Sequence, residues 1–228
     1  MPNKKSDIIN ILRTQSYTKK SLNELLKKVN KRLSYTDLSG INLSNLDLSG
    51  VDLSFSNLGG VNITNSKLNN SNFRSANLGG SNMGYCEAKN ADFECTNLSG
   101  INMPYGKADN AIFRGAALSG AYMAYNSLKN VDLSDAYLWG AFLRGSDLSG
   151  ANLSGAYLNG ADIKGANLSG SKLKSTLLRG ANIKNVIIKK SDAKDMLLSL
   201  NIIKVQVLKK LTFKEVSIIL ESKGVIIK

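Results

Sequence analysis

The sequence contains no histidine, and this absence removes several kinds of active site. Histidine is the commonest general base near neutral pH and the commonest ligand of transition metals. The only cysteines are Cys86 and Cys95, too few for a disulfide framework and typical of a reducing compartment. No nucleophile stands beside a recognisable base, so we expect a protein that is not an enzyme and has no metal or cofactor site.

Long apolar runs and proline are also scarce. No segment approaches the ~20 apolar residues of a membrane-spanning helix, so no membrane span is expected. The N-terminal stretch MPNKKSDIINILRTQ places Asp7 and Asn10 in its apolar part and is a poor signal peptide. We expect a cytoplasmic protein, with secretion as a bacterial effector left open.

The net charge of +13 is unevenly distributed. Most of the excess lies in residues 1–35 and 196–228, whereas residues 36–195 are nearly neutral. A positive balance is typical of proteins that bind nucleic acids. Nucleic-acid binding through the basic ends therefore stays an alternative.

What the sequence does contain is an unbroken five-residue repeat from Leu38 to Ala193, in which every fifth, central residue is apolar. The residue two positions before it (minus-two) is usually small, and glycine is frequent two positions after it (plus-two). A period of five fits neither a helix nor a plain strand. Each unit is therefore expected to hold a short strand, with its first and third side chains inward, and a two-residue corner.

Four such units would close one coil, so that residues twenty apart stack at the strand spacing of ~4.8 Å. Like residues do recur at this interval, and solenoid proteins use such stacks in place of a globular core. The expected core stacks are Phe73, Phe93 and Phe113 on one side and Met83, Met103 and Met123 on another. The sequence predicts an all-β solenoid of about eight coils.

Units such as TDLSG, SDLSG, ANLSG and ADIKG resemble those of the pentapeptide-repeat family. The resemblance covers residues 36–195 and implies a right-handed quadrilateral parallel β-helix with the central and minus-two residues inside. Some members of that family resemble DNA in size and acidity, bind DNA gyrase or topoisomerase IV, and confer quinolone resistance. A topoisomerase is therefore an alternative partner, which the basic charge of this chain disfavours.

The segments on either side of the repeat are expected to cap it, because open solenoid ends expose core and unpaired backbone. Residues 1–35 form the predicted helical N-terminal cap, with one helix from Asp7 to Arg13 and a second that begins at a capping box of Ser21 and Glu24.

Residues 196–228 form the predicted α/β C-terminal cap, since minus-two residues such as Asn201 and Gln206 no longer fit a small inward site. Thr212 is expected to cap a helix that ends before Gly224, and VIIK to form a short strand. Related proteins often dimerise through this end, so the resemblance implies a homodimer.

Charged residues on the outer surface also recur at the spacing of twenty. Two ion-pair ladders are expected, one of Arg74, Glu94 and Arg114 and one of Lys89, Asp109 and Lys129. Arg144, Lys164 and Lys184 instead stack like charges, which indicates either an anionic partner or a lysine-rich genome.

Aromatic residues outside the core concentrate on two adjoining sides. Tyr85, Tyr105 and Tyr125 are expected to form a ladder along one corner. Exposed aromatic clusters mark interfaces, so the candidate partner-binding residues are Tyr122, Tyr137, Trp139, Phe142 and Tyr157 with the basic Arg144, Lys164 and Lys184. The favoured function is a rigid protein–protein interaction module without catalytic activity, whose protein partner the sequence does not identify.

Overall fold

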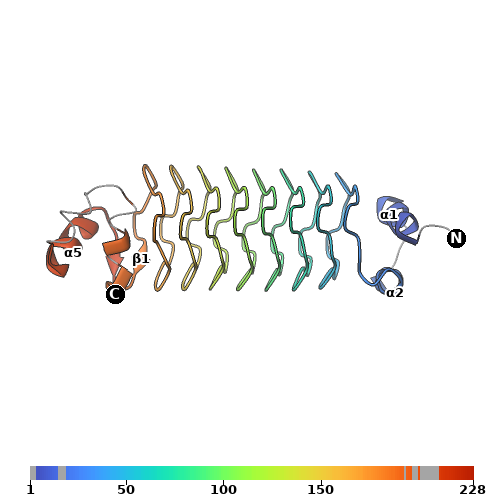
Figure 1. The fold of residues 1–228 in the computed structure, drawn as a ribbon, viewed down its shortest axis with the longest axis horizontal. Helices are drawn as coiled ribbons and strands as arrows, with labels where there is room; N and C mark the ends of the chain where they lie inside the picture. Colours follow the sequence, from blue (N-terminus) through green and yellow to red (C-terminus); the bar gives the residue numbers. More distant parts are fainter. Residues whose placement is uncertain (1–3, 15–18, 193, 197–199, 201–210) are drawn as a thin grey trace.

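The structure is a computed structural model that describes residues 4–14, 19–192, 194–196, 200 and 211–228. These residues form a rod with the two termini at opposite ends (Figure 1). No helix in the described part of the chain is long and apolar enough to cross a membrane.

Each coil of the rod takes up twenty residues, as the repeat predicts. Parallel bridges join the residues just before the central ones (minus-one) in adjacent coils, as in Asp37 with Asn57, Asn42 with Asn62, Asp47 with Lys67 and Asp52 with Asn72. Four bridges follow one another before the register repeats, so a coil has four sides. We name three of these sides after their central residues, as the phenylalanine side (Phe73, Phe93, Phe113), the leucine side (Leu78, Leu98, Leu118) and the methionine side (Met83, Met103, Met123).

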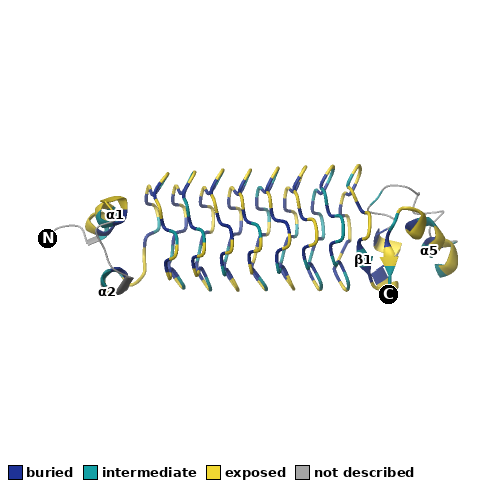
Figure 2. Ribbon diagram, turned by 180° about the vertical axis from the view of Figure 1, so that it is seen from behind, coloured by how far each residue is buried: buried dark blue, intermediate teal, exposed yellow. Residues whose placement is uncertain are grey.

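The central residues fill the interior, and buried and exposed positions alternate along every coil (Figure 2). Phe73, Phe93 and Phe113 stack with ring centroids 5.0 and 4.9 Å apart and nearly parallel planes. The methionines of the predicted second stack are equally buried. Both core stacks are therefore present.

Small polar residues at the minus-two position are also buried, and a backbone carbonyl 23 residues earlier accepts a hydrogen bond from several of them, although Ser171 Oγ has no partner among the described residues. Ser66 Oγ donates to the carbonyl oxygen of Leu43 at 2.7 Å, and Thr96 Oγ1 donates to that of Phe73 at 2.7 Å. A hydroxyl buried without a partner would destabilise the fold. The narrow interior thus accepts serine and threonine as readily as alanine.

The corners impose a left-handed backbone at every plus-two position from residue 35 to residue 185, with φ between 54° and 73°. Glycine adopts this conformation at no steric cost, as at Gly140. Other residues there, including tyrosine and phenylalanine, are strained by about 1 kcal/mol each. A bulky side chain at a corner therefore has an energetic cost that glycine avoids.

At the N-terminal end, helices α1 (Lys4–Thr14) and α2 (Lys19–Lys28) extend the core of the rod. Arg13 Nη2 donates to the carbonyl oxygen of Asp37 at 3.0 Å and ties α1 to the first coil. The predicted capping box is wrong, because α2 already includes Lys19 and Ser21 lies inside the helix. The first helix is longer at both ends than the sequence predicts.

At the C-terminal end, Thr212 caps α5 (Phe213–Ser222), as predicted, and it also forms a capping box with Glu215. The chain then turns at Gly224 into β2 (Ile226–Ile227), which pairs in parallel with β1 (Ile187–Ile188). β1 itself continues the bridge ladder of the rod. β2 therefore occupies the place that the next coil would take.

The transition between the rod and this end is only partly described. Met196 is fully buried, whereas Asn201 and Gln206, which are expected not to fit a small inward site, lie outside the described residues. The 3-10 helix η1 (Lys190–Asp192) follows β1 directly.

Asp192 holds the last described turn of the rod. Its Oδ2 accepts hydrogen bonds from the backbone N–H groups of Gly170 and Lys189, at 2.8 and 3.0 Å, and the residue is only 9% exposed. We expect Asp192→Ala to lower the free energy of unfolding by about 1 to 2 kcal/mol, because two part-buried backbone N–H groups lose their charged acceptor. Urea unfolding measures this loss, and Asp192→Asn, which keeps an acceptor oxygen, should lose less. Equal losses in both variants would contradict the role of Asp192 as the acceptor of these two hydrogen bonds.

Candidate functional site

Five aromatic side chains form one surface on two adjoining sides of the rod. Tyr137, Trp139 and Tyr157 lie on the leucine side, and Tyr122 and Phe142 lie on the methionine side. Between 43% and 52% of each residue is exposed, except for the half-buried Tyr157. We call these five residues the aromatic surface. Every residue along the corner between the two sides, from position 40 to position 180, is glycine, so no side chain separates the two halves.

The rings contact one another in a defined arrangement. Tyr137 and Tyr157 stack at 5.1 Å with nearly parallel planes, and Trp139 stands edge-on to both at 6.2 Å. On the methionine side, Tyr122 and Phe142 lie 6.1 Å apart and are tilted by 42°. These contacts hold the aromatic side chains in place before any partner binds.

Four of the five aromatic residues occupy minus-one positions, where the rod elsewhere mostly uses asparagine or aspartate. Asn77 Oδ1 accepts a hydrogen bond from Gly79 N at 3.1 Å, and Asn97 and Asp162 accept the equivalent bonds from the residues two positions on, both at 3.1 Å. Four members of the aromatic surface stand at this minus-one position, namely Tyr122, Tyr137, Phe142 and Tyr157. An aromatic ring provides no such acceptor, so each replacement gives up a bond worth about 1 kcal/mol. The contact between two such rings returns up to about 1 kcal/mol, which is less than the two hydrogen bonds that the pair gives up.

A shallow groove of about 270 Å³ adjoins the aromatic surface on the methionine side. Its lining residues are Tyr122, Ala124, Tyr125, Phe142, Arg144 and Asp162. Arg144 Nη2 lies 3.5 Å from Asp162 Oδ2, so a half-exposed ion pair borders the groove. We call it the anchor groove.

The expected corner ladder of Tyr85, Tyr105 and Tyr125 is present, with rings 5.3 and 5.5 Å apart. All three residues have left-handed φ values, between 56° and 59°, although glycine occupies many other corners. The Tyr125 ring lies over Gly145, where an added Cβ would come within 2.6 Å of it. The ladder therefore ends beside the anchor groove and contributes Tyr125 to it.

The three basic candidates lie in one column on the methionine side. Arg144 is paired with Asp162, so the predicted stack of like charges is interrupted by a carboxylate at this point. Lys164 is half-buried and Lys184 is exposed. The three residues share a side with the anchor groove but do not converge on one point.

The other expected charge ladders differ in their outcome. Glu94 forms ion pairs with both Arg74 and Arg114, so that ladder is confirmed. The ladder through Asp109 is wrong, because Lys129 Nζ lies 3.4 Å from Asp147 Oδ2. Asp109 instead accepts hydrogen bonds from the Ser127 hydroxyl and the Lys129 backbone N–H. Corner geometry, which the sequence pattern does not reveal, decides between these partners.

The two cysteines are expected to differ in reactivity. Cys86 is buried, its thiol donates to the Ile63 carbonyl oxygen, and burial raises the pKa of this thiol to about 12. Cys95 is exposed at a corner. A thiol reagent at pH 8 should therefore modify only Cys95 in the folded protein and both cysteines after unfolding. Mass spectrometry counts the modified cysteines. Modification of both in the folded state would contradict the packing described here.

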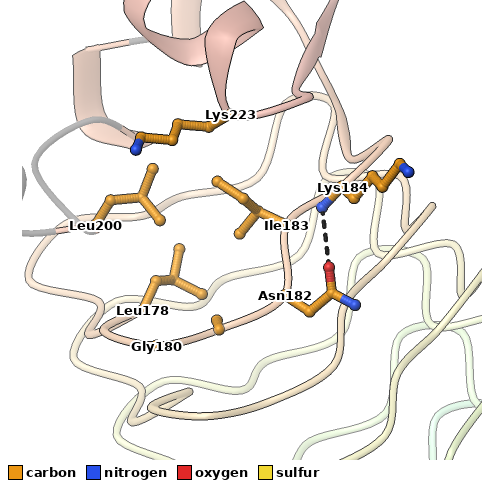
Figure 3. A pocket seen from close by; sticks show the side chains of 8 residues that line it. Leu178, Gly180, Asn182, Ile183, Lys184, Leu200 and Lys223 are labelled. Atoms are coloured by element: carbon orange, nitrogen blue, oxygen red, sulfur yellow. Dashed lines mark hydrogen bonds between the residues drawn. The ribbon is translucent and has the colours of Figure 1, made fainter.

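A second groove, of about 360 Å³, lies at the C-terminal end. Leu178 and Ile183 form its apolar floor, and Leu200 and Lys223 border it (Figure 3). The side chains of Lys184 and Lys223 extend toward opposite sides of the groove in Figure 3, so they do not form a joint anion site. This groove is a weaker candidate than the aromatic surface.

The repeat pattern is also matched by a model of pentapeptide repeats, in eight copies. The matched segments are residues 32–70, 71–104, 107–140, 127–165 and 161–195. The chain belongs to the pentapeptide-repeat family. Members of this family are solenoid repeat proteins, as the coils described above show for this chain.

Solved structures of other pentapeptide-repeat proteins resemble the chain at low identity. HetL, a protein involved in heterocyst differentiation regulation in the cyanobacterium Nostoc, is 24% identical over 73% of this chain and 96% of its own, with a TM-score of 0.29. A protein of the Arabidopsis thaliana thylakoid lumen is 23% identical over 55% and 70%, with a TM-score of 0.34. Full-length QnrB1, a plasmid-mediated fluoroquinolone resistance protein, is 22% identical over 73% and 90%, with a TM-score of 0.30. No curated protein sequence matches the chain.

Sequence reasoning missed part of this candidate site. Tyr125 was expected only as a corner residue, and Ala124 was not considered, yet both line the anchor groove. The stronger missed signal is the switch from asparagine to aromatic residues at the minus-one position, which the pattern of the repeat could have revealed. Tyr122 follows Asn62, Asn82 and Asn102 in the same column.

Proposed function

We propose that this pentapeptide-repeat protein is a rigid rod without catalytic activity that binds a protein partner through the aromatic surface. One observation carries the proposal. At four minus-one positions, the rod gives up the side-chain acceptor that asparagine or aspartate provides elsewhere, and it exposes an aromatic ring instead. Departures from the local rules of a fold are expected at functional or strained sites. Tyrosine and tryptophan are also enriched among the residues that dominate binding energy at interfaces.

We also propose that the chain consists of a rod and two terminal caps. Residues 36–195 form a right-handed rod of about eight coils, residues 1–35 cap its first coil, and residues 196–228 cap its last. Ile218 and Ile226 are exposed at the C-terminal end, which supports pairing with a second copy there. The two free cysteines support a cytoplasmic location.

A topoisomerase ranks second as a partner. Mimicry of DNA needs a continuous negative surface. Beyond residue 115, the leucine and methionine sides carry four cations and one carboxylate, namely Arg144, Lys164, Arg179, Lys184 and Asp162. The surface that we propose for docking therefore carries a positive charge, whereas DNA mimicry needs a negative one.

Site-specific photo-crosslinking in the native host tests the proposal. A photoreactive phenylalanine analogue is introduced at Tyr122 and, as a control, at Phe55, which is also an exposed aromatic residue but lies at a corner near the N-terminal end. The proposal predicts a discrete protein adduct from position 122 and none from position 55. Equal adducts from both positions, or adducts that nuclease removes, would contradict it.

A further inference from the structure

The anchor groove has the size and lining of a site for one side chain. Its volume of about 270 Å³ is enough to hold one large side chain. Tyr122, Tyr125 and Phe142 provide apolar walls, and the buried Ala124 leaves room between them. Interface anchors are apolar or aromatic side chains that fill such pockets. The groove therefore suits a protein side chain.

The charge around the groove restricts which protein surface can approach. From residue 116 to residue 185, the leucine and methionine sides contain Arg144, Lys164, Arg179 and Lys184 against Asp162 alone. From residue 36 to residue 105, the same two sides contain a single charged residue, Asp37. The positive charge is thus confined to the part of these sides that carries the aromatic surface. Complementary charge favours an acidic partner and repels a basic one.

The arrangement of the rings argues against single-stranded nucleic acid as the occupant. Proteins that bind single strands offer free ring faces on which bases stack. Here Tyr137 and Tyr157 already stack on each other at 5.1 Å, and Tyr105 covers one face of Tyr125 at 5.5 Å. The ring edges and the groove remain available, which suits a side chain better than a base.

We infer that the partner inserts an apolar side chain into the anchor groove and flanks it with carboxylates that meet Arg144 and Lys164. This inference rests on the proposed function and specifies the partner surface that the aromatic surface recognises. When the partner binds, its carboxylate competes with Asp162 for Arg144. The partner can contact this arginine because its side chain is 49% exposed. The contact should therefore weaken as the salt concentration rises.

A random-peptide phage library selected on the full-length protein tests the inference. Trp139 is the only tryptophan of the chain and belongs to the aromatic surface, so its fluorescence reports binding at the site directly. The selected peptides should combine an apolar residue with neighbouring aspartate or glutamate, and they should change this fluorescence. Phe142→Asn should weaken their binding by about thirtyfold or more, as for an interface anchor, and Arg144→Gln by about tenfold at low salt.

Ile112→Asn is the matched control, because Ile112 is an exposed apolar residue at the same minus-one position on the phenylalanine side. It should leave binding unchanged. Three results would overturn the inference. The library could yield no enriched peptides, the enriched peptides could be basic or neutral, or they could bind Phe142→Asn and Arg144→Gln as tightly as the unchanged protein. If the selected peptides bind both variants unchanged but still change the fluorescence of Trp139, the proposed docking function survives and only the role of the anchor groove is wrong. If oligo(dT) rather than peptide changes the fluorescence, both fail.

Discussion

Replacing Tyr122 and Phe142 together by asparagine should abolish binding of the protein partner while the free energy of unfolding changes by less than about 1 kcal/mol. Both residues stand at minus-one positions, where asparagine normally accepts a hydrogen bond from the backbone two residues on. Each new bond should contribute about 1 kcal/mol. This gain offsets the loss of the tilted ring contact between Tyr122 and Phe142, which is worth up to about 1 kcal/mol.

Binding should respond very differently from stability. The two rings line the anchor groove from adjacent coils, and truncation of such an anchor typically costs 2 kcal/mol or more, about thirtyfold in affinity. Urea unfolding measures the stability of each variant. Titration with the partner, purified after its identification by crosslinking, measures the affinity. Ile112→Asn makes the same chemical change away from the surface and should preserve both properties. Destabilisation by several kcal/mol in the double variant would mean that the rings serve the fold and not a partner.

Phe93→Ala should lower the free energy of unfolding by about 3 to 5 kcal/mol. Phe93 is fully buried between Phe73 and Phe113, at 5.0 and 4.9 Å, so its removal leaves a cavity in the middle of the rod. Neighbouring coils cannot close such a cavity, because the backbone bridges on all four sides fix the coil spacing. Chemical denaturation measures the loss.

Phe93→Leu is the matched control for that variant. Leucine already occupies the same column at Leu53 and Leu133, where it is buried as completely as phenylalanine is. The leucine variant should therefore retain most of the lost stability. Similar losses for leucine and alanine would show that the ring contacts, and not the filled volume, hold this part of the core.

The sequence predicts the coils of the rod because the five-residue period and the recurrence of like residues every twenty positions together indicate four units per coil. A central apolar residue every five positions, with small residues two positions earlier, leaves only a narrow four-sided interior. The stacks of Phe93 and Met103 with their neighbours follow directly from the period of twenty.

Other features depend on geometry that the period does not contain. Lys129 and Asp109 are twenty residues apart, yet the side chain of Lys129 reaches Asp147 instead. The start of α2 was misplaced, because Ser21 and Glu24 have the spacing of a capping box but lie within the helix. The anchor groove could not be foreseen either, since it depends on where the Tyr125 ring leans from a strained corner.

The single tryptophan of the chain allows a direct test of whether a partner docks on the aromatic surface. Protein labelled with fluorotryptophan gives one fluorine NMR resonance, from Trp139, which is 52% exposed in the rod alone. We expect this resonance to shift, and the indole to become shielded from solvent, when the partner identified by crosslinking is added. An unchanged resonance in a complex that elutes as one species by size-exclusion chromatography would contradict it.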